Sequence, residues 1–177
     1  MKTYFITRFN IFDYDFKGFQ ITQNNSAHKY KSEFFNKNRL EFKTSIFTNV
    51  TLPSIINQEH RNWEWHIYTS SYLPEKYLDK LLSSIKNYQN IHLIKVENFN
   101  EFYDKITNYL YSDQFATVRL DDDDALCKQY IKLLYKYKNN SGSIISFPYG
   151  REYKWKNLSI YIFCDVFLIL SNQNIPN

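Results

Sequence analysis

The sequence predicts an α/β fold with an open, largely parallel sheet flanked by helices. Short runs rich in β-branched and aromatic residues alternate with segments of helical periodicity through four units, and this alternation is typical of parallel sheets. The 177 residues, 44% of them hydrophobic, are enough for about one domain with its own core. Because no repeat or linker interrupts the pattern, we expect residues 1–177 to form a single domain.

Five runs are predicted to form the strands of the sheet, because each combines β-branched and aromatic residues over a length usual for a strand. They cover residues 3–9, 63–69, 91–96, 115–120 and 143–147. The tail segments 152–155 and 158–170 fit either a strand or a helix. The polar stretch 13–38 exceeds ordinary loop lengths, which predicts a functional or mobile loop.

Helical periodicity fills the intervals between most of these runs. We expect one helix over residues 39–50, followed by Pro53 as a break or a fresh start. A second helix is predicted over residues 74–85, with a proline in its first turn. Asn100 is expected to cap a third helix, and residues 125–137 are expected to form the fourth.

Charge and composition exclude several classes of protein. The net charge is +4, but the 22 basic and 18 acidic residues are interspersed, which argues against a nucleic-acid-binding surface. A modest positive charge suits an anionic small ligand or an anionic membrane surface. No stretch reaches the ~18 apolar residues of a membrane-spanning helix, and Cys127 and Cys164 lack the spacing of metal ligands. We therefore expect a cytoplasmic protein, with peripheral contact at the inner face of the membrane as a further option.

The most informative motif is the run Asp121-Asp122-Asp123-Asp124, which directly follows the fourth predicted strand. Adjacent carboxylates repel one another, and open α/β sheets bind ligands at the carboxyl ends of their strands. Asp121 and Asp123 have an Asp-x-Asp spacing that can hold Mg²⁺ or Mn²⁺ through hard oxygen ligands, leaving other positions for a diphosphate. The alternative is a solvated acidic turn that caps a helix starting at Ala125.

Two arginines and an asparagine are further candidates for this site. Arg8 and Arg119 each end a predicted strand, so both are expected to face the same crevice. A guanidinium there can bind a diphosphate through two hydrogen bonds. Ion pairing with the acidic run is the alternative role for each arginine. Asn10 follows the first strand and is the third candidate.

Other chemistries have little support in the sequence. There is no glycine-rich phosphate loop, which disfavours a Rossmann dehydrogenase and a P-loop enzyme. The histidines show no shared spacing, so we expect them at surface or strand positions rather than as ligands. They are His28, His60, His66 and His92.

Three segments together resemble the rhamnosyltransferase family, whose members are similar to GT-A-fold glycosyltransferases. The segments are Phe5 to Asn10, Thr51 to Gln58 followed by Trp63-Glu64-Trp65, and Arg119 to Leu126. The likeness extends over roughly residues 3–150, with the segments in matching order. It implies a GT-A-like fold for this chain.

The resemblance also implies a metal-dependent glycosyltransferase that uses a nucleotide-sugar donor. Asp121 and Asp123 match the two acids of the family's metal-binding motif, and Asp124 matches its trailing acid. The implied donor-binding residues are Thr7, Arg8, Asn10, Arg119 and Asp121. A Mn²⁺ or Mg²⁺ ion would neutralise the diphosphate while a hydroxyl of a glycan or lipid-linked acceptor attacks the anomeric carbon.

The C-terminus departs from the family pattern. Relatives continue into acceptor-binding segments that supply a carboxylate base, whereas this chain ends at Asn177, and Asp165 is a poor match in its apolar context. We therefore expect a complete donor half, a missing acceptor half and no assigned catalytic base. Two alternatives stay open: an inactive nucleotide-sugar-binding remnant, and a nucleotidyltransferase, against which the absent glycine-rich loop weighs.

Overall fold

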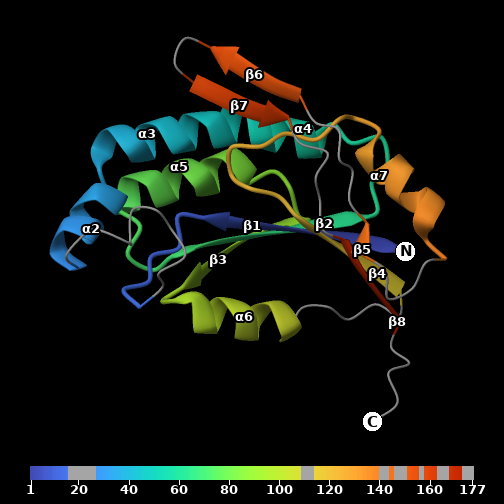
Figure 1. Ribbon diagram of the computed structural model, residues 1–177, viewed down its shortest axis with the longest axis horizontal. Helices are drawn as coiled ribbons and strands as arrows, with labels where there is room; N and C mark the ends of the chain where they lie inside the picture. The colour runs from blue at the N-terminus through green and yellow to red at the C-terminus, as the bar shows by residue number, and fades with distance from the viewer. Residues whose placement is uncertain are drawn as a thin grey trace.

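The computed structural model describes residues 1–15, 27–108, 114–139, 144–145, 151–155, 158–162 and 168–172. Its centre is a six-stranded sheet with the order β3-β2-β1-β4-β8-β5 (Figure 1). In that order the strands span Ile91–Val96, Trp63–Ser70, Lys2–Phe9, Gln114–Arg119, Leu168–Asn172 and Ile144–Ile145. The first four run parallel, whereas β8 is antiparallel to both of its neighbours. The predicted α/β fold with a largely parallel sheet is therefore confirmed.

Helices cover both faces of the sheet (Figure 1). Four of them lie on one face, namely α3 (Lys37–Ile46), α4 (Leu52–Ile56), α5 (Glu75–Ile85) and α7 (Tyr130–Leu134). The opposite face carries α6 (Phe99–Asn108). Parallel neighbours require such crossover connections, because a tight hairpin can join only antiparallel strands.

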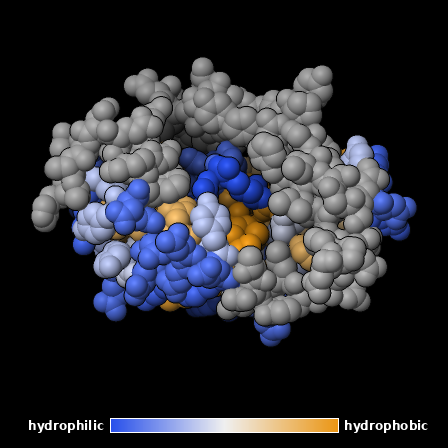
Figure 2. Space-filling view, turned by 60° about the horizontal axis from the view of Figure 1, so that its bottom comes forward, coloured by the Kyte–Doolittle hydropathy of each residue, from blue (hydrophilic) through white to orange (hydrophobic). Residues whose placement is uncertain are grey.

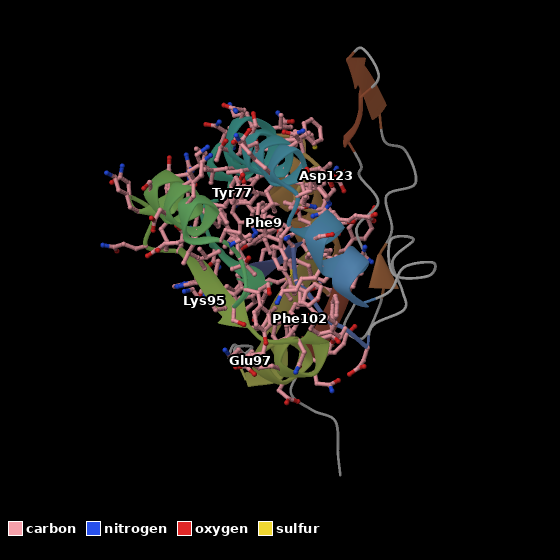
Figure 3. All side chains as sticks on the ribbon, turned by 90° about the vertical axis from the view of Figure 1, so that its left-hand side faces the viewer. Phe9, Tyr77, Lys95, Glu97, Phe102 and Asp123 are labelled. Carbon is pink, nitrogen blue, oxygen red and sulfur yellow. The ribbon has the colours of Figure 1, made fainter. Side chains whose placement is uncertain are left out.

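The main core lies between the sheet and the layer that contains α3 and α5. Phe5, Phe9 and Trp65 point into it from β1 and β2 and are fully buried, as the two-residue period of a strand requires. The ring of Phe47 lies 5.5 Å from that of Phe9 and 5.4 Å from that of Trp65, measured between centroids. Figure 3 shows Phe9 on the side of the sheet that carries α5 with its Tyr77. Burial of each such side chain contributes about 1.5–3 kcal/mol.

A second, smaller core lies between the sheet and α6. Tyr68 and Val96 from the sheet pack there against Phe99 and Phe102 of α6, and Figure 3 shows Phe102 on the far side of the sheet from Phe9. The central strands are therefore buried on both faces, which explains why their sequences are apolar with little alternation.

Pro53 neither breaks the helix nor starts a separate one, because the helical backbone continues without a gap from α3 into α4; the prediction of a break or fresh start is therefore wrong. α3 runs into a π-helical turn, η1 (Phe47–Thr51), and α4 follows directly with Pro53 in its first turn. The π-helical turn lies directly before the proline and changes the hydrogen-bond pattern there, with the N–H of Leu52 donating to the carbonyl of Phe47. The turn directs Thr51 toward the acidic run, and its hydroxyl donates to the carbonyl oxygen of Asp122 at 3.0 Å.

The helix predicted from Ala125 begins only at Tyr130, so that prediction is wrong over its first residues. Gln58 is the physical reason. Its amide nitrogen donates to the carbonyl of Cys127 at 2.8 Å, and its amide oxygen accepts from the backbone of Ile131 at 3.2 Å. The segment between the acidic run and α7 is thereby held in a non-helical conformation. The aspartates consequently do not cap a helix at Ala125.

The third helix and the polar stretch also differ from expectation. The backbone N–H of Glu101 donates to the side chain of Asn98 at 2.9 Å, so Asn98 caps α6 in place of Asn100. The stretch 13–38 contains the helix α2 (Ala27–Phe34). Its residues 16–26 lie outside the described part of the chain.

The tail forms strands in its described parts. β6 (Arg151–Trp155) and β7 (Leu158–Ile162) pair as an antiparallel ribbon, and β8 joins the main sheet beside β4. Among the described residues no helix is both long enough and apolar enough to cross a membrane.

Candidate functional site

A pocket of about 410 Å³ opens where β1 and β4 end. The two strands are neighbours, and the N–H of Leu120 donates to the carbonyl of Ile6 at 3.0 Å, which brings the acidic run beside residues 8–10. The volume is in the range of small-molecule sites. The lining residues come from five segments of the chain: Arg8, Asn10, Ile11, Phe34, Arg39, Lys43, Phe99, Asp121, Asp122 and Asp123. Acidic and basic side chains therefore converge on one cavity.

Asp121 is paired with two arginines. Arg119 Nη2 lies 3.2 Å from Asp121 Oδ2, and Arg8 Nη2 lies 3.8 Å from Asp121 Oδ1. Both arginines thus have the alternative role expected for them, which is ion pairing with the acidic run. Burial lowers the pKa of Arg8, and the neighbouring charge of Arg119 lowers it further. The side chain of Asp121 stays 44% exposed, so a ligand can still reach it, and such exposed pairs exchange partners at little cost.

Asp122 also lines the pocket, but its side chain is paired with a lysine of the helical layer. It is buried, and the ammonium group of Lys43 on α3 lies 2.8 Å from its Oδ1 and 2.7 Å from its Oδ2. Burial raises the pKa of Asp122, while the Lys43 charge opposes that effect. Together with the bond from Thr51, this pair fixes the position of the whole turn. The sequence pattern assigned no role to either Lys43 or Asp122.

Asp123 and Asp124 form the second half of the acidic run. Asp123 is exposed and lines the pocket (Figure 3), whereas Asp124 is half-buried just outside the lining. Neither forms an ion pair within the described part of the chain. Burial, followed by the charges of the neighbouring aspartates, raises the pKa of Asp124 to about 7. Carboxylates that lack an ion-pair partner and repel one another suit a divalent cation, since hard oxygen ligands are those that Mg²⁺ and Mn²⁺ prefer.

Arg39 closes the opposite side of the pocket. Its guanidinium donates to the carbonyl of Phe34 at 2.7 Å and to the side-chain oxygen of Asn10, and it stacks over the Phe34 ring at 4.7 Å. Burial lowers its pKa. Asn10 is buried and has a φ of 55°, in the left-handed region. Its amide nitrogen has no hydrogen-bond partner among the described residues, so the pocket holds an unused buried donor.

Thr7 and Arg119 lie outside the pocket lining. Thr7 is fully buried, and its hydroxyl accepts a hydrogen bond from Trp65 Nε1 at 2.9 Å. Because side chains alternate along a strand, Thr7 faces the core while Arg8 faces the site. Arg119 is connected to the site by its ion pair with Asp121.

An apolar groove adjoins the pocket on the side of α6. It has a volume of about 270 Å³ and is lined mainly by Ile6, Phe102 and Ile106, with Arg8 and Arg119 also in its lining. Figure 2 shows this face of the molecule, where hydrophobic residues in orange lie in a hollow below hydrophilic residues in blue. Arg8 belongs to both cavities, so the groove begins where the charged pocket ends.

Comparisons with known proteins give matches to solved structures and to one sequence family. A crystal structure of S. aureus TarS 1-349 superposes with a TM-score of 0.48 at 11% sequence identity, covering 79% of this chain and 33% of that one. The chain therefore spans about a third of the length of that structure. No curated protein matches the sequence.

The sequence match is to a family described as "Putative rhamnosyl transferase", and it covers residues 2–145. The matched range contains β1, the helices from α3 to α7, β4 and the acidic run. The open, largely parallel sheet agrees with the GT-A-like fold that the family resemblance implies. This chain belongs to the putative rhamnosyl transferase family, a family of glycosyltransferases.

Proposed function

We propose that this chain is a metal-dependent glycosyltransferase that binds the diphosphate of a nucleotide-sugar donor in the pocket at the ends of β1 and β4. One observation carries the proposal: the solvent-accessible carboxylates of Asp121 and Asp123 line a single cavity together with partly buried basic side chains of other elements. A divalent cation and a diphosphate together complement such a site, because the carboxylates attract the cation and the basic groups attract the phosphates.

Asp121, Asp123 and Asp124 are the residues that would hold Mn²⁺ or Mg²⁺. Asp121 and Asp123 present their carboxylates to the pocket, and Asp124 adds a third acid beside them. A bound cation would neutralise the diphosphate and stabilise it as a leaving group. Lys43 and Asp122 would not be ligands of the metal ion. Their role would be to hold the turn in place.

The basic side chains would bind the phosphate oxygens. Arg39 is already oriented by Phe34 and Asn10, so its guanidinium can form two parallel hydrogen bonds with little loss of entropy. Arg8 can transfer from Asp121 to a phosphate when the carboxylate binds a cation. The unused amide nitrogen of Asn10 offers a further donor. Thr7 would act only by fixing β1 against Trp65.

The apolar groove beside the pocket supports a lipid-linked acceptor as one form of the hydroxyl substrate. It borders Arg8, and the reacting sugar would lie near that border. The enzyme would then work at the cytoplasmic face of the membrane.

A nucleotide-sugar-binding protein without turnover is the second candidate. The observation that favours it concerns the base: among the described residues, every carboxylate that lines the pocket belongs to the acidic run. If those carboxylates hold the cation, none is left to deprotonate the acceptor. Asp165 lies outside the described residues.

Thermal unfolding with nucleoside diphosphates tests the binding part of the proposal. We expect a nucleoside diphosphate to raise the melting temperature in Mn²⁺ and to have no effect in EDTA. The double variant Asp121→Asn/Asp123→Asn should lose the shift, whereas the exposed Asp79→Asn on α5 should keep it. An unchanged shift in the double variant would remove the metal assignment. Release of sugar or its transfer from a nucleotide-sugar donor would then separate the enzyme from the binding protein.

A further inference from the structure

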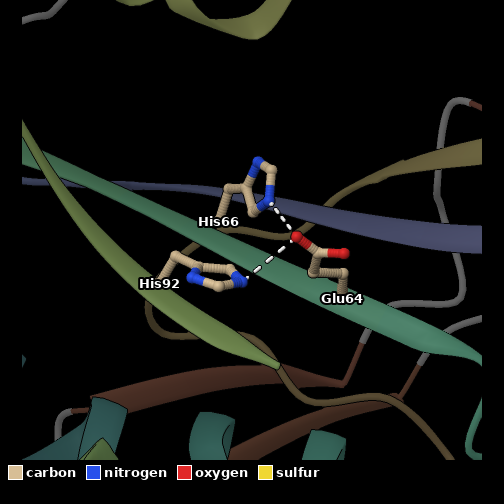
Figure 4. A group of neighbouring side chains, drawn as sticks. All are labelled: Glu64, His66 and His92. Atoms are coloured by element: carbon tan, nitrogen blue, oxygen red, sulfur yellow. Dashed lines mark hydrogen bonds and ion pairs between the residues drawn. The ribbon is translucent and has the colours of Figure 1, made fainter. Parts of the chain in front are cut away.

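Three side chains gather on the sheet face that carries α6, outside the lining of both cavities. Glu64 and His66 come from β2, and His92 comes from β3 (Figure 4). Nε2 of His66 lies 3.0 Å from Glu64 Oε1, and Nε2 of His92 lies 3.1 Å from the same oxygen. All three potential ligand atoms lie within 4.8 Å of one another. One carboxylate oxygen is therefore shared by two imidazole nitrogens.

The strand register explains why these residues meet. His66 and His92 are direct partners in the parallel pairing of β2 with β3, and their rings lie 5.3 Å apart, nearly perpendicular to each other. Glu64 precedes His66 by two residues and therefore projects from the same face. The spacing within the sequence gave no sign of the cluster, because it depends on pairing between two strands.

The surroundings hold the cluster in place while leaving it open to solvent. Lys2 binds the other carboxylate oxygen of Glu64, so Oε1 is the oxygen that faces the histidines. The Tyr4 ring packs edge-on against His66 at 5.9 Å. His66 is buried, whereas the side chain of His92 is 44% exposed. An ion can thus enter past His92 toward a fixed Glu64 and His66.

The donor set selects the type of ion. Two imidazoles and one carboxylate suit zinc and related transition metals better than magnesium or calcium. A tetrahedral Zn²⁺ places its ligand atoms about 3.3 Å apart, close to the two distances in the cluster. The contact between Lys2 and Glu64 has the form of an outer hydrogen bond that orients a metal-binding carboxylate.

We propose that Glu64, His66 and His92 bind one Zn²⁺ ion, with a fourth position open to water. This site is separate from the proposed Mn²⁺ or Mg²⁺ site of the acidic run, which consists of oxygen ligands alone. Its ligands come from two neighbouring strands, so the ion would link β3, the edge strand, to β2. The site would therefore stabilise that edge of the sheet.

Equilibrium dialysis of the tag-free full chain against Zn²⁺, without nucleotide, tests this proposal. We expect one equivalent of Zn²⁺ per chain and a higher melting temperature than in EDTA. His92→Gln should weaken binding at least about tenfold, and because His92 is exposed the variant should fold. His60→Gln is the matched control: His60 stacks on Tyr135 away from the cluster, so this variant should bind as the unmodified chain does.

Two outcomes would overturn the proposal: no stoichiometric Zn²⁺, or equal binding by His92→Gln and His60→Gln. Glu64→Gln gives a second measurement, since it keeps the size of the side chain and removes the charge, and it too should weaken binding. The variant Asp121→Asn/Asp123→Asn should retain Zn²⁺. Failure of this proposal is thus distinguishable from failure of the diphosphate site, which is measured with Mn²⁺ and nucleotide.

Discussion

Lys43 of α3 contacts both carboxylate oxygens of Asp122, at 2.8 Å and 2.7 Å, and this pair joins the helical layer to the acidic turn. The carboxylate is almost wholly buried. Removing one partner of a buried pair leaves an uncompensated charge, which costs far more than the loss of an exposed pair. The turn that presents Asp121 and Asp123 to the pocket therefore depends on a lysine distant in sequence.

The first prediction concerns that pair. Lys43→Met should lower the free energy of unfolding by about 3–5 kcal/mol, measured by urea denaturation. Lys76→Met is the control, because Lys76 pairs with Glu41 on the surface at 2.9 Å, and the loss of an exposed pair should change the free energy of unfolding far less. Adding Asp122→Asn to Lys43→Met should recover part of the loss, since the buried charge is gone. Equal costs for the two lysines would contradict the prediction.

The second prediction concerns pH and Asp124. Its pKa is about 7 in the folded chain and lower in the unfolded chain, so the folded state takes up the proton first as the pH falls. The unfavourable contribution of this carboxylate is thus fully present above pH 7 and disappears as the pH falls toward its ordinary pKa. In EDTA, Asp124→Asn should therefore raise the melting temperature at about pH 8 and change it little near pH 4.

Solvent screening limits the size of this effect on the melting temperature. Because Asp124 is only half-buried, we expect a gain near 1 kcal/mol, or about 2–4 °C for a chain of this length. Burial also lowers the pKa of His66, so this residue destabilises the fold as the pH falls. Comparing the variant with the unmodified chain at each pH separates the effect of Asp124 from that of His66, because both chains contain His66. A gain of the same size at both pH values would show that charge is not its cause.

Strand and helix patterns predicted most of the fold because they depend on local periodicity. The four parallel strands, for example, follow from apolar runs that are buried on both faces. The start of α7 could not be predicted, since Gln58, about seventy positions away, binds the backbone of Cys127 and Ile131. The hydrogen bond from Thr51 to Asp122 likewise joins residues distant in sequence, so local periodicity could not predict it.

The candidate site was predictable only in part, for a related reason. Parallel strands end at the same edge of a sheet, so the approach of Arg8 to the acidic run follows from the strand assignment alone. Arg39 and Lys43 were missed because their contribution depends on the rotation of α3 about its own axis. The cluster around His66 was missed because it depends on the register of β2 with β3.

The third prediction concerns Arg39. Arg39→Lys keeps the positive charge but loses the planar pair of donors, so the affinity for a nucleoside diphosphate with Mn²⁺ should fall about tenfold or more, equivalent to about 1.4 kcal/mol. Isothermal titration calorimetry measures this. Arg61→Lys is the control, because Arg61 bonds to the carbonyl of Ile56 and does not line the pocket. Equal affinities of the two variants would argue against phosphate binding by Arg39.

The fourth prediction separates two roles of Asn10. Its φ of 55° is unfavourable for alanine and free of cost for glycine. Asn10→Ala should therefore be less stable than Asn10→Gly by about 1 kcal/mol in urea denaturation. Both variants remove the oxygen that accepts from Arg39, so both should bind the nucleoside diphosphate more weakly than the unmodified chain, and to a similar extent.

The two measurements fail independently. If the glycine and alanine variants are equally stable, the left-handed backbone of Asn10 contributes nothing to the fold. If both bind the nucleotide as tightly as the unmodified chain does, the side chain neither orients Arg39 nor donates to the ligand. Because the backbone effect acts on stability and the side-chain effect acts on affinity, a weaker affinity of both variants together with lower stability of the alanine variant assigns both roles to Asn10.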